Sequence, residues 1–257
     1  MNNNFEGIEF NEVERTKKVR KKKHYLLRLL IILCVVFGIL CFINSGIFGL
    51  REVEVEGGSF YNDEQIINLS EVREGDNLFF SENIKNIPET LQKNPYFKEV
   101  RVSRVLPAKI VIKVKERKQV AAVVYGDEFV VIDQKGRVLR KSKVNPKLTS
   151  IYGLTISKLN LGEKIEAEEK STMNQTIELI DSMEKGNIFF KKIDMSKVVI
   201  KAYVYDNLIV KGTPKQIISS LEKGELQKVI NNLIRHDTVR GTISMGDHNY
   251  MSFSPRF

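Results

Sequence analysis

Cysteine is almost absent from this sequence of 257 residues. The chain has two, Cys34 and Cys41, and both lie within one long apolar run near the N-terminus. The rest of the sequence therefore has no thiol with which to form a disulfide or to bind a metal through sulfur. We expect the part after the apolar run to be stabilised by an ordinary hydrophobic core, without redox chemistry.

Histidine is scarce too, and the sequence lacks short motifs that usually accompany catalysis. Of its three histidines, His236 and His248 follow the apolar run. The sequence has no His-Glu-x-x-His, no Gly-x-Ser-x-Gly and no phosphate-binding Gly-x-x-x-x-Gly-Lys-Ser/Thr. Asp237 and Asp247 adjoin the two histidines, but neighbours in sequence are poor grounds for a base and its orienting partner. We therefore favour histidines in turns or on the surface, and we predict no enzymatic activity.

Four carboxylates between residues 163 and 169 are a candidate cation site, because oxygen ligands suit Ca²⁺. Acidic residues are also favoured at the start of a helix, where they meet the positive end of its dipole. We favour this second interpretation and predict no metal and no cofactor. The four residues are Glu163, Glu166, Glu168 and Glu169.

One long apolar run extends from Leu26 to Phe48, and Arg28 is its only charged residue. At about 1.5 Å per helical residue, roughly 20 apolar residues cross a hydrocarbon core about 30 Å thick. The run therefore predicts a membrane-spanning helix. A cleaved signal peptide is the alternative, but the run exceeds the roughly 7 to 15 apolar residues of a signal core. In either case we expect the chain after the run to be extracytoplasmic.

The flanking charges predict the orientation of this span, because lysines and arginines beside a span stay on the cytoplasmic side. Residues 1–28 carry eight basic and four acidic residues, and glutamates dominate just after the run. We therefore expect the N-terminus inside, with Lys21, Lys22, Lys23 and Arg28 as the basic membrane anchor. Of the net charge of +9, this segment holds +4 and the rest +5. No dense basic run with interleaved aromatics follows the span, so we predict no nucleic-acid binding.

The segment after the span predicts a small α+β layer. Three stretches have the alternation of half-buried strands, and two helical stretches separate the first strand from the second. Proline favours the first turn of a helix, so we expect the second helix to begin at Pro88. The order predicts two helices on one face of a three-stranded sheet. The expected strands are 50–56, 97–106 and 109–116, and the first helix is expected to begin at Asn62 or Asp63.

The second half of the chain predicts a β-rich domain with flanking helices. Runs rich in Val, Ile and aromatic residues, bounded by turn residues, predict its strands. Apolar residues at helical spacing predict two amphipathic helices, at 165–185 and 215–235. The expected strands are 120–125, 128–133, 189–195, 198–205, 208–211, 241–245 and 250–255.

Several short motifs in both halves resemble the bacterial cell division family FtsQ/DivIB. They include Gly75-Asp-Asn-Leu-Phe79, Asn94-Pro-Tyr-Phe97, Val114-Lys-Glu-Arg117 and Phe129-Val-Val-Ile-Asp-Gln-Lys-Gly-Arg-Val138. The resemblance implies an α+β fold class with one N-terminal transmembrane helix, a POTRA-type β-α-α-β-β domain and then a β-rich domain with flanking helices. It also implies a crossing segment at 143–154 within the β-rich domain. We expect a cytoplasmic tail at 1–24, the transmembrane helix at 25–49, the POTRA domain at 50–117, the β domain at 118–246 and a C-terminal tail at 247–257.

The resemblance also implies a non-enzymatic scaffold of the division machinery, the divisome. Such a protein would bind other single-span septal proteins, FtsL and DivIC (FtsB in Gram-negative bacteria), and a septal peptidoglycan synthase. It would help couple division-ring assembly to septal peptidoglycan synthesis. The expected location is the cell membrane at the division septum, as a single-pass type II protein. Two alternatives are a POTRA-containing polypeptide transport or assembly factor and a membrane-anchored cell-wall enzyme.

A binding surface for such partners is expected at the C-terminal strands. An open strand can accept a partner strand, with backbone hydrogen bonds for attachment and side chains for selectivity. The alternative is a last strand that only completes the sheet. In the family the last strand binds its partner by such pairing, and on that resemblance we assign the partner-binding residues. They are Thr242, Ile243, Ser244, Met245, Tyr250 and Phe253, with the two aromatic residues as anchors.

Overall fold

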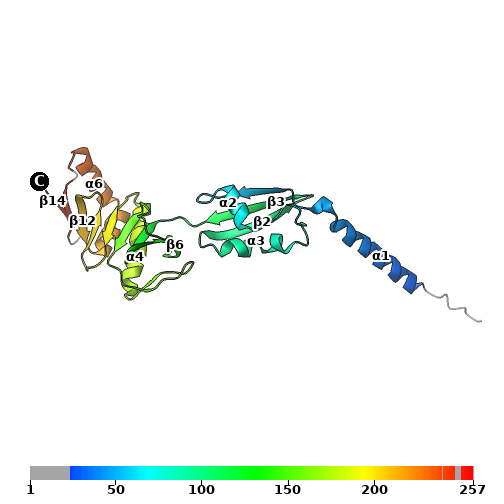
Figure 1. Ribbon diagram of the computed structural model, residues 1–257. Coiled ribbons are helices and arrows are strands. Elements are labelled where there is room, and N and C mark those ends of the chain that lie inside the picture. Colours follow the sequence, from blue (N-terminus) through cyan, green and yellow to red (C-terminus); the bar gives the residue numbers. More distant parts are fainter. Residues whose placement is uncertain (1–23, 239, 247–249, 257) are drawn as a thin grey trace, which may run out of the picture. The chain divides into compact units, whose positions relative to one another are not determined.

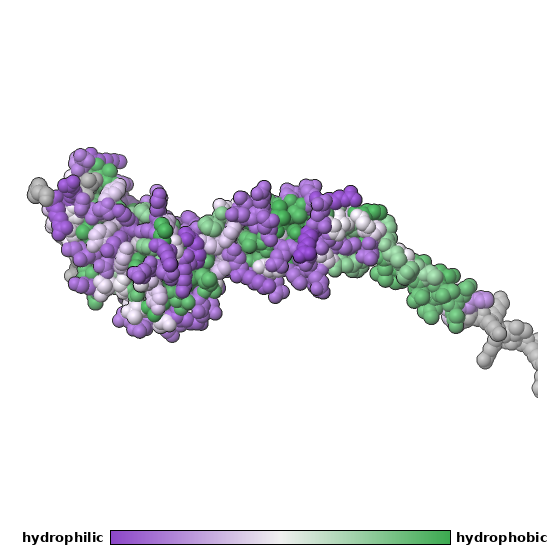
Figure 2. Space-filling model, viewed as in Figure 1, coloured by the Kyte–Doolittle hydropathy of each residue, from purple (hydrophilic) through white to green (hydrophobic). Residues whose placement is uncertain are grey.

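The computed structural model describes residues 24–238, 240–246 and 250–256 (Figure 1). The chain divides into two compact units, Met1–Ser45 and Gly46–Phe257. The first contains α1 (Tyr25–Ile43), a strongly apolar helix of 19 residues with no buried side chain. Its apolar surface is green in Figure 2. By length and composition α1 can cross a membrane, as the sequence predicts.

The second unit begins with a three-stranded sheet of the predicted β-α-α-β-β order. β1 (Glu52–Glu56) is parallel to β3 (Lys109–Glu116), which is antiparallel to β2 (Phe97–Val105). The helices α2 (Asp63–Leu69) and α3 (Glu82–Gln92) connect β1 to β2. β3 is therefore the central strand, with order β1-β3-β2.

One face of this sheet carries a core shared with both helices. Ile110 and Ile112 on β3 are fully buried, and they lie on one face because strand side chains alternate. Ile66 of α2 and Ile87 of α3 are buried in the same cluster. The prediction that two helices cover one face of a three-stranded sheet is confirmed.

Pro88 does not start the second helix of this layer. α3 begins at Glu82 and continues through Pro88. A proline inside a helix removes one backbone hydrogen bond. Here Ile84, Ile87 and Leu91 are buried along one side of α3, and this packing holds the helix on both sides of the proline. The sequence-based prediction of the helix start is therefore wrong.

A nine-stranded sheet forms the second part of this unit, with the order β14-β13-β12-β11-β10-β7-β4-β5-β6. β14 and β6 are its two edge strands, and β8 and β9 form a separate two-stranded ribbon. The strands are β4 (Ala121–Tyr125), β5 (Glu128–Ile132), β6 (Val138–Ser142), β7 (Thr149–Tyr152), β8 (Ile156–Lys158), β9 (Glu166–Ala167), β10 (Lys192–Asp194), β11 (Ile200–Tyr203), β12 (Leu208–Gly212), β13 (Gly241–Met245) and β14 (Met251–Pro255).

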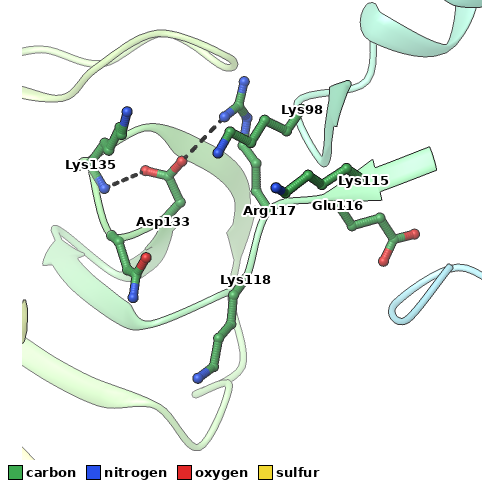
Figure 3. Close-up of a pocket in the computed structure, with 8 residues that line it drawn as sticks. Lys98, Lys115, Glu116, Arg117, Lys118, Asp133 and Lys135 are labelled. Carbon is green, nitrogen blue, oxygen red and sulfur yellow. Dashed lines mark hydrogen bonds and ion pairs between the residues drawn. The ribbon is translucent and has the colours of Figure 1, made fainter. Parts of the chain in front are cut away.

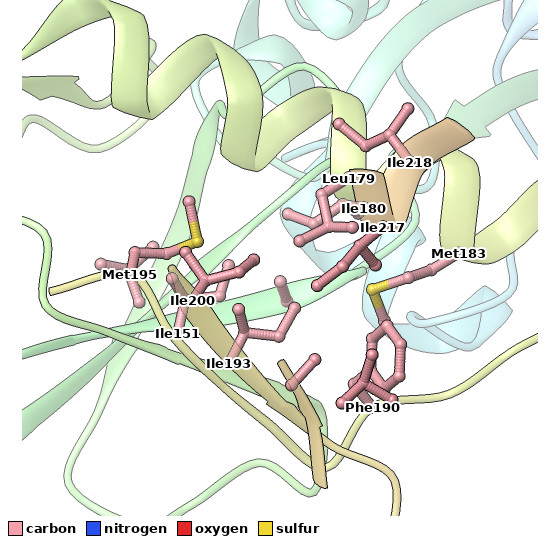
Figure 4. Close-up of a cluster of buried hydrophobic side chains, with 14 of the residues drawn as sticks. Ile151, Leu179, Ile180, Met183, Phe190, Ile193, Met195, Ile200, Ile217 and Ile218 are labelled. Carbon is pink, nitrogen blue, oxygen red and sulfur yellow. The ribbon is translucent and has the colours of Figure 1, made fainter. Parts of the chain in front are cut away.

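The helices α4 (Lys170–Lys185), α5 (Pro214–Glu222) and α6 (Glu225–Arg235) complete this part of the chain. Buried side chains of α4 and α5 meet those of the sheet in one core (Figure 4). The predicted fold class, with a POTRA-type layer followed by a β-rich part with flanking helices, is confirmed. The core includes Ile151, Leu179, Ile180, Met183, Phe190, Ile193, Ile200, Ile217 and Ile218.

Three elements of this part differ from prediction. The helix expected at 165–185 begins only at Lys170, because Glu166 and Ala167 pair with β8 as the strand β9. The helix expected at 215–235 is two helices, because Gly224 between them has a φ of +69°, a conformation that residues with a side chain rarely adopt. The crossing segment expected at 143–154 contains β7, which lies between β4 and β10 in the sheet. Thr149 and Ser150 are buried there, and these polar residues obscured the strand pattern.

Candidate partner-binding site

The last two strands form a hairpin at one edge of the nine-stranded sheet. β13 is parallel to β12 on one side and antiparallel to β14 on the other. Gly241 permits close packing within this hairpin. Its φ is +151°, and a Cβ there would lie 2.6 Å from the Phe253 ring and from the Ser254 carbonyl oxygen. Only glycine fits this contact.

Hydrogen bonds at both ends of the hairpin define the direction of its backbone groups. The Gly246 N–H donates to the Tyr250 carbonyl at 2.7 Å, and the Arg256 N–H donates to the Arg240 carbonyl at 3.4 Å. Inward and outward groups alternate along an antiparallel strand. The even-numbered residues of β14 therefore direct their backbone groups toward β13, and the odd-numbered residues direct theirs away from the sheet.

The outward row of β14 consists of Met251, Phe253 and Pro255. Met251 and Phe253 each offer an N–H and a carbonyl, whereas Pro255 offers a carbonyl alone. Within residues 24–238, 240–246 and 250–256, these outward groups have no hydrogen-bond partner and no strand lies beyond them. Free donors and acceptors of this kind are the means by which an open strand accepts another. We call this row the β14 edge.

The side chains of β14 divide between the two faces of the sheet. Met251 and Phe253 are partly buried against the core. Ser252 and Ser254 are exposed on the opposite face, and Tyr250 just before the strand is 71% exposed. A strand added at this edge would meet small polar side chains on one face and apolar ones on the other.

The structure divides the predicted binding residues between two strands. On β13, Thr242, Ile243 and Ser244 pair with both β12 and β14, and the Ile243 side chain is fully buried. Met245 pairs with β14 alone. Tyr250 and Phe253 border the β14 edge, so the open edge is narrower than the predicted stretch from Gly241 to Phe253. Their part in binding stays a prediction. The β13 residues of the predicted set are Thr242, Ile243, Ser244 and Met245.

The predicted membrane anchor is placed only in part. Lys21, Lys22 and Lys23 lie outside the described residues. Arg28 lies in the first turn of α1 and is exposed. Its long side chain can carry the guanidinium toward lipid headgroups at the end of a span.

A second polar feature, a pocket of about 190 Å³, lies where the chain passes from β3 to β4. Its acidic groups are already engaged, as Figure 3 shows for Asp133. Asp133 Oδ2 lies 3.6 Å from an Arg117 guanidinium nitrogen, and Oδ1 accepts the Lys135 N–H at 2.9 Å. Cations outnumber carboxylates here, so the pocket favours anions. The lining residues are Lys98, Lys115, Glu116, Arg117, Lys118, Asp133, Gln134 and Lys135.

Glu116, the other carboxylate of this pocket, holds the loop that follows β1. It accepts the backbone N–H groups of Ser59 at 2.9 Å, Phe60 at 2.6 Å and Tyr61 at 3.2 Å, and also the Ser59 hydroxyl at 2.8 Å. Burial by itself would raise the pKa of Glu116, but these hydrogen bonds hold the pKa below its ordinary value. The two residues of the Glu-Arg motif thus hold different segments. Glu116 binds the loop after β1, and Arg117 Nε donates to the Pro95 carbonyl at 3.1 Å.

The carboxylates and histidines considered for chemistry lie in ordinary surroundings. Glu163 is paired with Lys158 at 2.8 Å, and the hydrogen bond from Lys158 lowers the pKa of Glu163. Glu166 lies on β9, before α4, and His236 is exposed at the end of α6. His248 lies outside the described residues. Within the part of the chain that the structure describes, no three His, Cys, Asp or Glu side chains could hold a metal.

The fold defines a class of protein: one apolar helix, followed by a POTRA-type layer and a β-rich part that ends in an open strand. The family description "POTRA domain, FtsQ-type" matches residues 48–117. The cell division protein DivIB of Clostridium tetani is 30% identical over 219 residues, which cover 82% of this chain and 79% of that protein. The chain belongs to the DivIB/FtsQ family of cell division proteins, and the resemblance seen in the sequence is confirmed.

Other relatives agree with this assignment. DivIB of Clostridium botulinum (strain Hall) is 28% identical over 234 residues, covering 86% of this chain and 90% of that protein. DivIB of Bacillus subtilis is 23% identical over 208 residues, covering 79% and 76%. The major extracytoplasmic domain of DivIB from Geobacillus stearothermophilus matches 47% of this chain and 97% of that structure, with 15% identity and a TM-score of 0.30. The DivIB proteins of the two Clostridium species and of Bacillus subtilis support a role in cell division and come from no enzyme family. The apolar helix fits a single-pass membrane protein.

Met251 and the Glu116 loop contacts were missed in the sequence. The alternation Met251-Ser-Phe-Ser254 indicates a strand with two unlike faces, and that signal could have directed attention to Met251. The outward direction of its backbone depends on where the hairpin turns, which the alternation does not specify. The contacts of Glu116 join residues 55 to 57 positions apart, and no local pattern reveals such a distance.

Proposed function

We propose that this protein is a non-enzymatic divisome scaffold, anchored by α1 with its N-terminus in the cytoplasm and the unit Gly46–Phe257 outside. It acts at the division septum and binds other single-span septal proteins of the FtsL and DivIC type. Through these contacts, and through a septal peptidoglycan synthase, it helps couple division-ring assembly to septal peptidoglycan synthesis.

The β14 edge is the observation that carries this proposal. Its outward N–H and carbonyl groups are unpaired among the described residues, in a chain whose relatives are cell division proteins. Soluble proteins usually protect an exposed strand edge, because it invites pairing with other chains. An edge that ends the chain's largest sheet and is left open is a suitable place for a partner strand. Pro255 limits the row, because it has no N–H to donate.

Because the protein is anchored in the membrane, an edge as short as β14 is sufficient to bind a membrane-anchored partner. Two backbone residues form few hydrogen bonds, and each contributes about 0.5–1.5 kcal/mol net. Partners that are themselves anchored beside this protein meet it at a raised effective concentration, so weak contacts combine into a stable assembly. A modest affinity of the partner strand for β14 is therefore enough, and no extensive interface is required.

Photo-crosslinking in dividing cells tests the proposal. A photoreactive amino acid is placed at Tyr250, Ser252 or Ser254, one at a time, in the full chain. All three side chains are exposed beside the β14 edge. We expect each to crosslink to another single-span septal protein, because a strand paired with β14 would pass beside the face on which these three side chains lie.

Tyr125 is the matched control, since it is exposed at the end of the interior strand β4, away from the edge. The same photoreactive group there should yield no such crosslink. Crosslinks only from the POTRA-type layer, for example from Phe60, would refute the assignment of β14. Normal septation after depletion, with no partner recovered from any position, would refute the scaffold function.

A further inference from the structure

The POTRA-type layer carries exposed apolar side chains at the end where the chain enters it from α1. They come from three segments that are far apart in the sequence: the first residues of the unit, the loop after α2, and the turn between β2 and β3. Isolated exposed apolar residues are common on protein surfaces, but a contiguous group marks an interaction site. We call this group the entry patch; it consists of Ile47 (50% exposed), Phe79 (43%), Phe80 (54%), Val105 (45%) and Leu106 (58%).

Backbone hydrogen bonds hold the loop of the entry patch to the start of the unit. The Leu78 N–H donates to the Phe48 carbonyl at 2.9 Å, and Gly49 forms a bridge with Asn77. The Phe48 and Phe79 rings pack edge to face with centroids 5.3 Å apart. The Leu78 side chain is fully buried in the core and anchors the loop there. The two phenylalanines that follow it, Phe79 and Phe80, remain on the surface.

The β2–β3 turn is held to the same place. The Arg51 N–H donates to the Ala108 carbonyl at 2.8 Å. Arg104 Nε donates to the Leu78 carbonyl, which ties the β2 strand to the loop. The three segments therefore form one surface, and Figure 2 shows apolar green colour at this end of the layer.

The short covalent connection between α1 and the second unit indicates that the entry patch lies near the membrane. α1 ends at Ile43, and the short 3₁₀ turn Gly46–Phe48 already belongs to the second unit. Few residues thus separate the end of the apolar helix from the entry patch. Phenylalanine and aliphatic side chains on an anchored domain insert readily at the boundary between headgroups and acyl chains. Arg51 and Arg104 are exposed next to the patch and suit the anionic headgroups of the same lipids.

We infer that the entry patch inserts into the outer leaflet of the membrane that α1 crosses. The POTRA-type layer would then rest on the lipid surface through its Phe79-Phe80 loop and its β2–β3 turn, rather than being tethered by a single strand of chain. This inference rests on the single-span topology proposed above.

The absence of tryptophan from the sequence makes a clean test possible. Phe80→Trp gives the full chain a single tryptophan at an exposed position, where the substitution is conservative. The protein is reconstituted in vesicles of phosphatidylethanolamine and phosphatidylglycerol, some of which carry bromine near the glycerol end of the acyl chains. We expect emission shifted to shorter wavelength, strong quenching by the brominated lipid, and several-fold weaker quenching by aqueous iodide.

Two further single-tryptophan variants serve as controls for position 80. Phe37→Trp lies in α1, and Phe60→Trp lies in the POTRA-type layer on the loop that Glu116 holds. The inference predicts lipid quenching at positions 37 and 80 but not at 60. Quenching at 37 alone, with position 80 open to iodide, would overturn the entry patch and leave the span standing. Failure at 37 would refute the span and the inference with it, and equal quenching at 60 and 80 would show unspecific adsorption instead.

Discussion

At the scale of single residues, the structure shows what two residues of the sequence, Glu116 and Gly241, contribute to the fold. Glu116 is part of a family-like Val-Lys-Glu-Arg run, and its carboxylate collects four donors from the loop after β1. Gly241 opens the penultimate strand, and its missing Cβ leaves room for the Phe253 ring. Both residues act over distances in sequence that local patterns do not reveal.

Glu116→Gln should lower the free energy of unfolding. The amide keeps the shape of the side chain but loses the negative charge that strengthens its hydrogen bonds, and its NH₂ group faces other donors. We expect a loss of about 1–2 kcal/mol, reduced by solvent screening because the group is partly exposed. Thermal unfolding of the full chain in detergent, followed by circular dichroism, measures the difference.

The pH dependence of this effect has a definite sign. The folded-state pKa of Glu116 is lowered from its ordinary value of 4.5, so its contribution to stability is present above that value. The contribution is lost as the pH falls through the lowered folded-state pKa. The gap between the wild type and Glu116→Gln should therefore close in acid. Glu99→Gln serves as the control, because the Glu99 carboxylate is exposed and pairs with Arg101; an equal loss in both variants would contradict the assigned role.

At the scale of elements, β14 is the strand on which the proposed function depends. Met251→Pro removes one outward N–H, while the hydrogen bonds that β14 makes with β13 come from the even-numbered residues and are kept. Proline is tolerated on edge strands for this reason. We expect binding to the crosslinked septal partner to weaken about 5- to 10-fold, the equivalent of one hydrogen bond.

Met251→Ala is the matched control for that variant, because it removes the same side chain but retains the N–H. It should bind the partner nearly as well as the wild type does in a pull-down with the full chain. If the alanine and proline variants lost binding equally, the side chain and not the backbone edge would carry the contact. Circular dichroism of both variants checks that the sheet is intact.

The elements that the sequence predicted correctly are those with strong periodic patterns. The alternation of valine and glutamate identified β1, and the apolar run identified α1. Predictions failed where tertiary packing outweighed a local signal, as at Pro88, which the buried face of α3 accommodates. They failed also at Gly224, where one left-handed residue divides two helices. The open edge was predicted, but its restriction to β14 required the pairing order of the sheet.

At the scale of the whole molecule, the proposed function makes the chain a set of contact surfaces attached to one anchor. α1 fits a membrane span, the POTRA-type layer carries the entry patch, and the β-rich part presents the β14 edge. No single surface needs high affinity, because anchoring raises the local concentration of every membrane-bound partner. Such an arrangement suits the proposed scaffold function, in which the protein would hold other division proteins at one membrane position.

Residue-resolved amide hydrogen exchange tests the central claim most directly. The full chain is compared alone and bound to the single-span septal partner identified by crosslinking. The claim predicts that the Met251 and Phe253 amides, which point outward, exchange fast in the free chain and slowly in the complex. The Ser252 and Ser254 amides, which face β13, should change little. A stable complex in which Met251 and Phe253 exchange as fast as in the free protein would contradict strand pairing at β14.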